Sequence, residues 1–185
     1  LLIYFGENIF KYEDINKFAS DFNKTFTDSL KSKTEAVKWL SINEALKKYK
    51  TDKRKIFISL QTPWCPTCQI MDNITYHNEK FANYLNTKTY PVRLDATTKD
   101  SIIFNNYLFI NENNEHPFHQ FAVTLLGGKM SFPNVVFFDE NLNRISNVPG
   151  YMTISGAEPI FKYFIEDHYK TINWENFIKT FSKEF

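Results

Sequence analysis

The chain has 185 residues, of which 43% are apolar and 17% aromatic, enough to fill the core of one domain. Lysines and arginines number 22 against 21 aspartates and glutamates, so the net charge of +1 gives no argument for a nucleic acid or an anionic membrane as partner. No apolar run approaches the roughly 18 residues of a membrane-spanning helix, so we expect no transmembrane segment in this chain.

The first 35 residues contain one candidate helix. Apolar side chains recur there at steps of three and four residues, as on one face of a helix: Ile15, Phe18, Phe22, Phe26 and Leu30. We expect residues 1–35 to form an N-terminal extension packed on the main domain, and a helix that binds a partner or lies near a membrane is the alternative. The chain begins with LLIYF rather than Met, which we interpret as a mature or trimmed chain.

Residues 36–185 are predicted to form one domain of alternating strands and helices. Ser41 and Glu44 have the spacing of a capping box, and short apolar, β-rich runs such as KIFISL have the composition of buried strands. The elements expected in this part are a helix over 42–50, a strand over 55–60, a helix from near Cys65, a helix capped by Asn78 and a strand over 90–96.

A hairpin and a helix are predicted next. In IIFNNYLFI, over 102–110, two β-rich arms flank Asn105 and Asn106, a pair suited to a tight turn because asparagine tolerates positive φ. The following helix is expected to start with Pro117 at its first position and to end at Gly127.

The last third is predicted to hold an antiparallel hairpin and two helices. The hairpin comes from FPNVVFFDENLNRISNV, and Ser155 with Glu158 has the spacing of a second capping box at the start of a helix. Aromatic residues of the final helix are expected in the core: Trp174, Phe177 and Phe181. The order of elements predicts a mixed sheet covered on both faces.

Both cysteines lie in the segment WCPTC. Two intervening residues at the start of a helix bring the two Cα atoms to about the 5.5 Å that a disulfide prefers. Free N–H groups and the helix dipole stabilise a thiolate at a helix N-terminus, so Cys65 is expected to be the nucleophile and Cys68, one turn further in, the resolving thiol. Pro66 supports this placement, because proline fits the first helical turn.

Other interpretations of the pair stay open. The two thiols could be inert and buried, or Cys65, Cys68 and Met71 could carry Cu(I), a soft ion that thiolates and thioethers bind. A zinc site is disfavoured, because zinc takes four ligands and no histidine has ligand spacing to the pair: His77, His116, His119 and His168. We predict no metal and no cofactor beyond the dithiol.

Residues 36–170 resemble the thioredoxin superfamily. The resemblance rests on KIFISL, the WCPTC segment, VRLD, FPNVVFFD with Pro133 opening a strand, and Gly150 after the hairpin. Within the superfamily, the chain looks most like bacterial thioredoxin-like disulfide reductases, through Met71, Thr75, Tyr84-Leu85-Asn86, Val92, Arg93 and Asp95. The resemblance implies a thioredoxin-like three-layer α/β/α fold with a mixed central sheet, an inserted hairpin–helix segment and extra N- and C-terminal helices.

The resemblance also implies a function. It is that of a thiol–disulfide oxidoreductase acting on protein disulfides, with an upstream redox partner, in the bacterial periplasm or with the cytoplasm as alternative. It implies a cis bond before Pro133 and a substrate chain that pairs with the backbone of Phe132 as an added strand. The substrate-binding residues implied are Trp64, Pro66, Thr67, Phe132, Pro133 and Gly150.

Three features depart from the thioredoxin pattern. Ser59 stands where thioredoxins carry a buried aspartate that takes the proton of the resolving thiol, and Phe132 stands where threonine is usual. Residues 100–130 are longer than in a plain thioredoxin, and we expect the extra hairpin and helix to extend the sheet or the rim of the site. These departures keep a binding or chaperone-like module as the second hypothesis.

Overall fold

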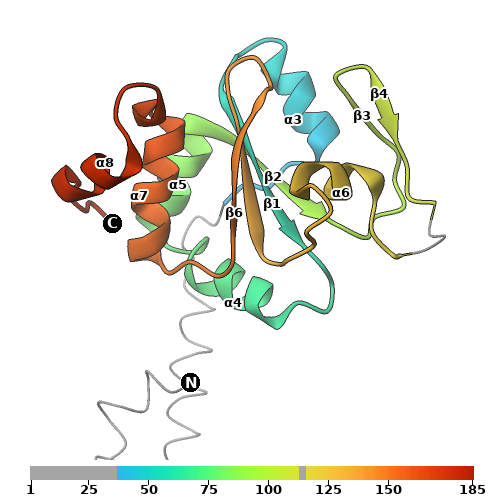
Figure 1. Cartoon of the computed structure of the whole chain (residues 1–185), viewed down its shortest axis with the longest axis horizontal. Coiled ribbons are helices and arrows are strands. Elements are labelled where there is room, and N and C mark those ends of the chain that lie inside the picture. Colours follow the sequence, from blue (N-terminus) through green and yellow to red (C-terminus); the bar gives the residue numbers. More distant parts are fainter. Residues whose placement is uncertain (1–36, 113–115) are drawn as a thin grey trace, which may run out of the picture. The chain divides into compact units, whose positions relative to one another are not determined.

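The computed structural model describes residues 37–112 and 116–185. A four-stranded sheet runs through this part of the chain in the order β2-β1-β5-β6 (Figure 1). Its strands are β1 (Lys55–Gln61), β2 (Thr89–Asp95), β5 (Asn134–Phe138) and β6 (Arg144–Pro149). β2 runs parallel to β1, whereas β5 and β6 are antiparallel to their neighbours, so the predicted mixed sheet is confirmed.

Side chains of β1 alternate between two cores. Ile56 and Ile58 point into one core and Phe57 into the other, as the two-residue period of a strand requires. Because both faces are covered, the strand reads as a continuous apolar run, which is why KIFISL could be recognised in the sequence.

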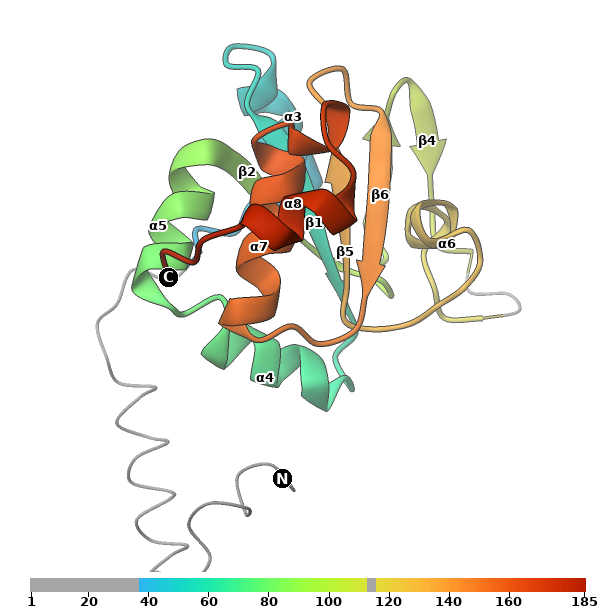
Figure 2. The ribbon, with the colours of Figure 1, turned by 60° about the vertical axis from the view of Figure 1, so that its left-hand side comes forward.

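Helices cover both faces of the sheet, which confirms the three-layer fold. One face carries α3 (Ile42–Tyr49) and α6 (Gln120–Leu126). The other carries α4 (Pro66–Ile74), α5 (Glu79–Lys88) and α7 (Ile154–Ile165). After a 3-10 turn at His168–Lys170, α8 (Trp174–Thr180) packs on α7 (Figure 2). No helix of the described residues is both long and apolar enough to cross a membrane.

The predicted N-terminal caps of α3 and α5 are confirmed, and in both the capping residue and its partner are three residues apart. Ser41 Oγ accepts the N–H of Glu44 at 3.3 Å, and the Glu44 carboxylate accepts the N–H of Ser41 at 2.8 Å, so the capping box forms. Asn78 caps α5 as expected, because its side chain accepts the N–H of Phe81 at 3.0 Å.

The predicted hairpin forms, but it does not extend the central sheet. Strands β3 (Ile102–Phe104) and β4 (Tyr107–Phe109) make a separate two-stranded sheet. Its turn residues Asn105 and Asn106 have φ of 50° and 65°, the left-handed region that asparagine tolerates. Phe104 holds the hairpin to the domain by packing into the core beneath α3 and α6.

The predicted start of α6 at Pro117 is wrong. The helix begins at Gln120, and the buried ring of His119 caps it by accepting the N–H of Phe121 at Nδ1, at 3.1 Å. The N–H of His119 is bonded to the carbonyl of Ala96 at 2.7 Å, so this residue is fixed by a distant loop rather than by its neighbours. Gly127 ends the helix with φ of 59°, as expected.

The capping box at the start of α7 is also wrong. The helix begins at Ile154 after Thr153, which makes no side-chain cap, and Glu158 is fully buried inside it. Of the aromatic residues of the last helix, Phe177 is buried as expected, but Trp174 is exposed. The expectation for residues 1–35 lies outside the described residues.

Candidate functional site

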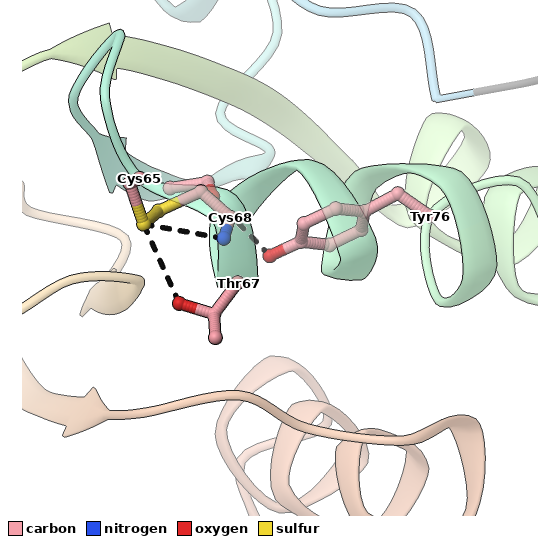
Figure 3. Close-up of a disulfide and its surroundings, with 5 residues drawn as sticks. Cys65, Thr67, Cys68 and Tyr76 are labelled. Atoms are coloured by element: carbon pink, nitrogen blue, oxygen red, sulfur yellow. Dashed lines mark hydrogen bonds between the residues drawn. A yellow bond between two sulfur atoms is a disulfide. The ribbon is translucent and has the colours of Figure 1, made fainter. Parts of the chain in front are cut away.

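The end of β1 leads directly into the cysteine pair. Cys65 and Cys68 form a disulfide with their Cα atoms 5.3 Å apart. Cys65 is the N-cap of α4, and Pro66 takes the first helical position, where its missing N–H costs no hydrogen bond (Figure 3). The prediction of a helix starting near Cys65 is therefore confirmed, and the positive end of the helix dipole faces the sulfur of Cys65.

Hydrogen bonds distinguish the two sulfurs. Cys65 Sγ accepts the backbone N–H of Cys68 at 3.2 Å and lies 3.5 Å from Thr67 Oγ1 (Figure 3). Exposure does not distinguish them, because Cys65 is 7% exposed and Cys68, one turn further into the helix, is 5% exposed. Both donors favour negative charge on Cys65 after reduction, which makes it the better nucleophile of the two.

Phe132, Pro133 and Gly150 lie at the same end of the sheet. Asn134 pairs with Leu60, so the peptide before it lies where β1 runs toward the cysteines. The Phe132–Pro133 bond is cis, and the carbonyl of Pro133 accepts the N–H of Gly150 at 2.8 Å. Phe132 is half-buried and Pro133 buried.

Trp64, Pro66 and Thr67 form the exposed side of the cysteine segment. Trp64 is 60% exposed, an unusual position for so large an apolar ring in a folded chain. Pro66 and Thr67 are exposed beside it. An apolar surface around a disulfide suits the capture of another polypeptide better than that of a small polar molecule.

Ser59 is half of a buried hydroxyl pair. Its side chain lies on the face of β1 that Phe57 also uses, toward α4. Tyr76, just after α4, donates its hydroxyl to Ser59 Oγ at 3.4 Å and points back toward the cysteines (Figure 3). Burial raises the pKa of Tyr76 well above its ordinary value, against a smaller opposing effect of the Ser59 hydrogen bond. Two neutral hydroxyls therefore lie where thioredoxins carry a buried aspartate.

Tyr76 was not singled out in the sequence. It lies eight residues after Cys68, about two helical turns, which is the spacing of side chains on one helical face. That signal was available, but the sequence gives no sign that the chain would return its hydroxyl to a strand seventeen residues earlier.

The Tyr76 phenol makes stability depend on alkaline pH. The pKa of Tyr76 is higher in the folded chain than its value of about 10 in the unfolded chain. The neutral phenol therefore contributes stability that is fully present below about pH 10 and is lost as the pH rises from there through the folded pKa. We expect Tyr76→Phe to lower the free energy of unfolding by about 1 kcal/mol at pH 8 through the lost hydrogen bond. The difference from the original chain should shrink toward pH 11, measured by urea unfolding; an equal difference at both pH values would contradict this.

Thr62 carries a polar atom without a partner. Its Oγ1 is the one buried side-chain N or O atom of the described residues that has no hydrogen bond. Thr62→Val keeps the shape and removes the hydroxyl, so we expect it to raise the free energy of unfolding by about 1 kcal/mol. Thr75→Val is the matched control, because the buried Thr75 Oγ1 donates to the carbonyl of Met152 at 2.6 Å and its loss should destabilise. Equal destabilisation by both changes in urea would refute the prediction.

Arg93 and Asp95 of β2, two residues of the family resemblance, are half-buried. Arg93 forms an ion pair with Asp72 of α4 and stacks over the ring of Trp39 with 4.5 Å to the centroid. Burial lowers the pKa of Arg93, against the raising effect of Asp72. The pair ties the cysteine helix to β2, so its role is to position α4.

The residues considered as metal ligands have structural surroundings of their own. Met71 is buried in the core formed with α5 and α7. No group of three or more His, Cys, Asp or Glu residues in the described ranges could hold a metal ion. His119 is buried, and that burial lowers its pKa, so the neutral ring serves as the cap of α6.

Comparisons with known proteins agree with this geometry. The profile of the family described as thioredoxin-like domain matches residues 42–165, whereas a comparison with curated protein sequences gives no match. Among solved structures, DsbH oxidoreductase aligns with a TM-score of 0.50 and 18% identity, over 72% of this chain and 87% of that one. A thioredoxin from Thermus thermophilus aligns at 0.51 and 13%, over 72% and 88%. A thioredoxin-fold protein from Helicobacter pylori aligns at 0.54 and 13%, over 79% and 85%.

At such low identities the solved structures establish the fold alone. The family profile does more, because it covers more than half of the chain and includes the cysteine pair and Pro133. The resemblance to the thioredoxin superfamily is thereby confirmed, and the chain belongs to the family of thioredoxin-like domains.

Proposed function

We propose that this protein is a thiol–disulfide oxidoreductase that acts on protein disulfides. The observation that carries the proposal is the position of Cys65. It caps α4, accepts the N–H of Cys68 at its sulfur, and is already bonded to Cys68 in a disulfide. Reduction of that disulfide places a stabilised thiolate beside a second thiol, which is the arrangement that disulfide exchange needs.

The reaction proceeds in two exchanges. The Cys65 thiolate attacks one sulfur of the substrate disulfide, and the other substrate sulfur leaves as a thiolate and takes a proton. Cys68 then loses its proton and attacks Cys65 Sγ, which releases the second substrate sulfur as a thiolate. The substrate gains two electrons, the Cys65–Cys68 disulfide forms, and a dithiol partner restores the reduced protein. The opposite direction uses the same steps in reverse.

The proton of Cys68 distinguishes this site from a general reductase. Ser59 and Tyr76 are both neutral hydroxyls at physiological pH, so neither is the base that takes it. Water or the leaving substrate thiolate is left to do so, which slows the second exchange relative to a site with a buried carboxylate. The proposal is therefore a dedicated reductase, an oxidant or an isomerase rather than a fast general reductase.

The reduction potential tests the proposal and gives the direction. The protein is equilibrated in graded thiol/disulfide buffers, and the fluorescence of Trp64, adjacent to the disulfide, reports the redox state. A potential near about −270 mV indicates a reductase, and one near about −120 to −180 mV an oxidant or isomerase. A Cys65–Cys68 pair that forms no stable disulfide in any buffer would refute the proposal.

A bacterial, periplasmic location is part of the proposal, with the cytoplasm as alternative, and it rests on the family resemblance. Fractionation of the source cells tests it. Recovery in the periplasmic fraction is the expected result, and recovery only with the cytoplasm would refute the location without touching the chemistry.

A further inference from the structure

The residues just before α6, over 116–119, lie at the cysteine end of the sheet. The N–H of Ala96, directly after β2, donates to the carbonyl of Gln61, the last residue of β1, at 2.8 Å. The carbonyl of Ala96 in turn accepts the N–H of His119 at 2.7 Å. Two short hydrogen bonds thus connect the end of β1, four residues before Cys65, to the residue that follows Phe118.

The side-chain amide of Asn111 also contacts this region. Asn111 Nδ2 lies 3.2 Å from the carbonyl of Thr97, 3.0 Å from that of Thr98 and 2.9 Å from that of Pro117. The buried His119 adds a contact from Nε2 to the carbonyl of Asp100 at 3.0 Å. The backbone around Phe118 is therefore held on the loop that follows β2.

This anchoring brings a row of rings to the residue before Pro133. The rings of Phe118 and Phe132 have centroids 5.7 Å apart, and those of His116 and Phe118 lie 5.8 Å apart. Phe118 and Phe132 are half-buried against the core beneath α3 and α6, and His116 is exposed. The N–H of Phe118 donates to His116 Nδ1 at 3.2 Å, which orients the exposed ring.

The row of rings ends at Phe132, the residue beside which a substrate chain would pair. Under the proposed function, the substrate backbone adds as a strand beside Phe132, and directly opposed residues of paired strands have Cβ atoms about 4.5–5.5 Å apart. A substrate side chain next to the reacting cysteine then meets the ring of Phe132, and Phe118 is the next ring along the row. Both are neutral and apolar, so they favour an aromatic or bulky apolar side chain over a polar one.

We propose that Phe118 is a specificity-determining residue, and that with Phe132 it selects peptide disulfides carrying an aromatic residue beside the cysteine. The inference rests on the proposed function and deepens it by naming the substrate class. An aromatic contact of this kind is worth about two- to tenfold in rate constant for each ring engaged.

Two matched peptides test this inference. Each is a short cysteine peptide oxidised to its homodimeric disulfide, one with phenylalanine and one with serine next to the cysteine. Bis(2-hydroxyethyl) disulfide, which is too small to reach the rings, serves as the third substrate. The rate constant for oxidation of the reduced protein is followed through Trp64 fluorescence for the original chain, Phe118→Ala, Phe118→Leu and Tyr107→Ala, an exposed residue of the same insert.

The original chain is expected to prefer the phenylalanine peptide by about tenfold. Phe118→Ala should reduce this preference to the part that Phe132 supplies alone and leave the rate with bis(2-hydroxyethyl) disulfide unchanged, while Tyr107→Ala keeps the preference. If Phe118→Ala does not fold, Phe118→Leu decides, because it keeps the bulk and should lose only part of the preference. A preference unchanged in the Phe118 variants, or equal rates for both peptides with the original chain, overturns the inference alone. Failure of the original chain to react with any of the three disulfides overturns the proposed function with it.

Discussion

Cys65→Ser is expected to abolish disulfide reduction, with a loss of at least about 10³-fold in rate. The hydroxyl of serine does not ionise near neutral pH, so the N–H of Cys68 and the positive end of α4 have no thiolate to stabilise. The measurement is the reduction of a peptide disulfide by the dithiol protein. Retained activity would show that Cys65 is not the nucleophile.

Cys68→Ser is the matched variant, because it also removes the disulfide but leaves the nucleophile. It should still attack and then accumulate a mixed disulfide with the substrate, visible as a mass increase that dithiothreitol reverses. Loss of the short Cys65–Cys68 loop removes only about 2 kcal/mol of unfolded-state restriction by the chain-entropy model. Because both variants lack the disulfide, their free energies of unfolding are compared with that of the original chain in its reduced form.

The same two variants separate the enzyme from a binding module. A chaperone-like protein would use the exposed Trp64 and the surface near Phe132 without needing either sulfur. Suppression of aggregation of an unfolded protein that survives in Cys65→Ser would support the second hypothesis. Its loss together with the exchange reaction would support the enzyme.

Local interactions explain which features could be predicted from the sequence. The capping box of Ser41 and Glu44 closes within one turn, and the turn at Asn105 and Asn106 depends on the conformations of those two residues alone. The placement of Cys65 at a helix start needs only its neighbour Pro66 and the strand before it. In such cases the sequence neighbourhood contains all the partners.

Distant partners explain what could not be predicted. The cap of α6 depends on His119, which is held by Ala96, and the hydroxyl of Tyr76 finds Ser59 across two layers. The ring contact of Phe118 with Phe132 joins the insert to the residue before Pro133 only after the sheet has formed. A single sequence shows these residues but not their proximity.

Glu158 is the clearest case of a residue whose partners are distant in the sequence. Its spacing from Ser155 matched a capping box, yet its carboxylate faces the C-terminal segment. Oε1 accepts the N–H of Glu184 at 2.7 Å, and Oε2 accepts that of Phe185 at 3.4 Å. The carboxylate therefore binds donors twenty-six and twenty-seven residues away instead of the N-terminus of its own helix. A fully buried carboxylate needs several hydrogen-bond donors, and Thr153 at the helix start offers none through its side chain.

Lys162 completes this buried site. Its ammonium lies 3.3 Å from Glu158 Oε1 and 2.7 Å from Glu184 Oε2, and its side chain is also buried. Burial opposes the charge of Lys162, but hydrogen bonds to Glu184 and Glu158 outweigh burial and raise its pKa. The lysine is therefore charged in the folded protein and depends on Glu158 as its buried counter-ion.

Glu158→Ala is accordingly expected to lower the free energy of unfolding by about 2–3 kcal/mol, because Lys162 keeps only the exposed Glu184 carboxylate as its partner and two N–H groups lose their acceptor. Glu158→Gln should lose less, since its amide oxygen still accepts one N–H. Replacing Glu158 and Lys162 together by methionine should recover part of the loss, because no charge then stays buried although the two N–H groups still lack their acceptor. Urea unfolding measures all three, with the exposed Glu175→Ala as control. If Glu158→Ala costs no more than Glu175→Ala, the buried site does not stabilise the fold; if the double variant is no better than the single one, the loss comes from packing rather than from charge.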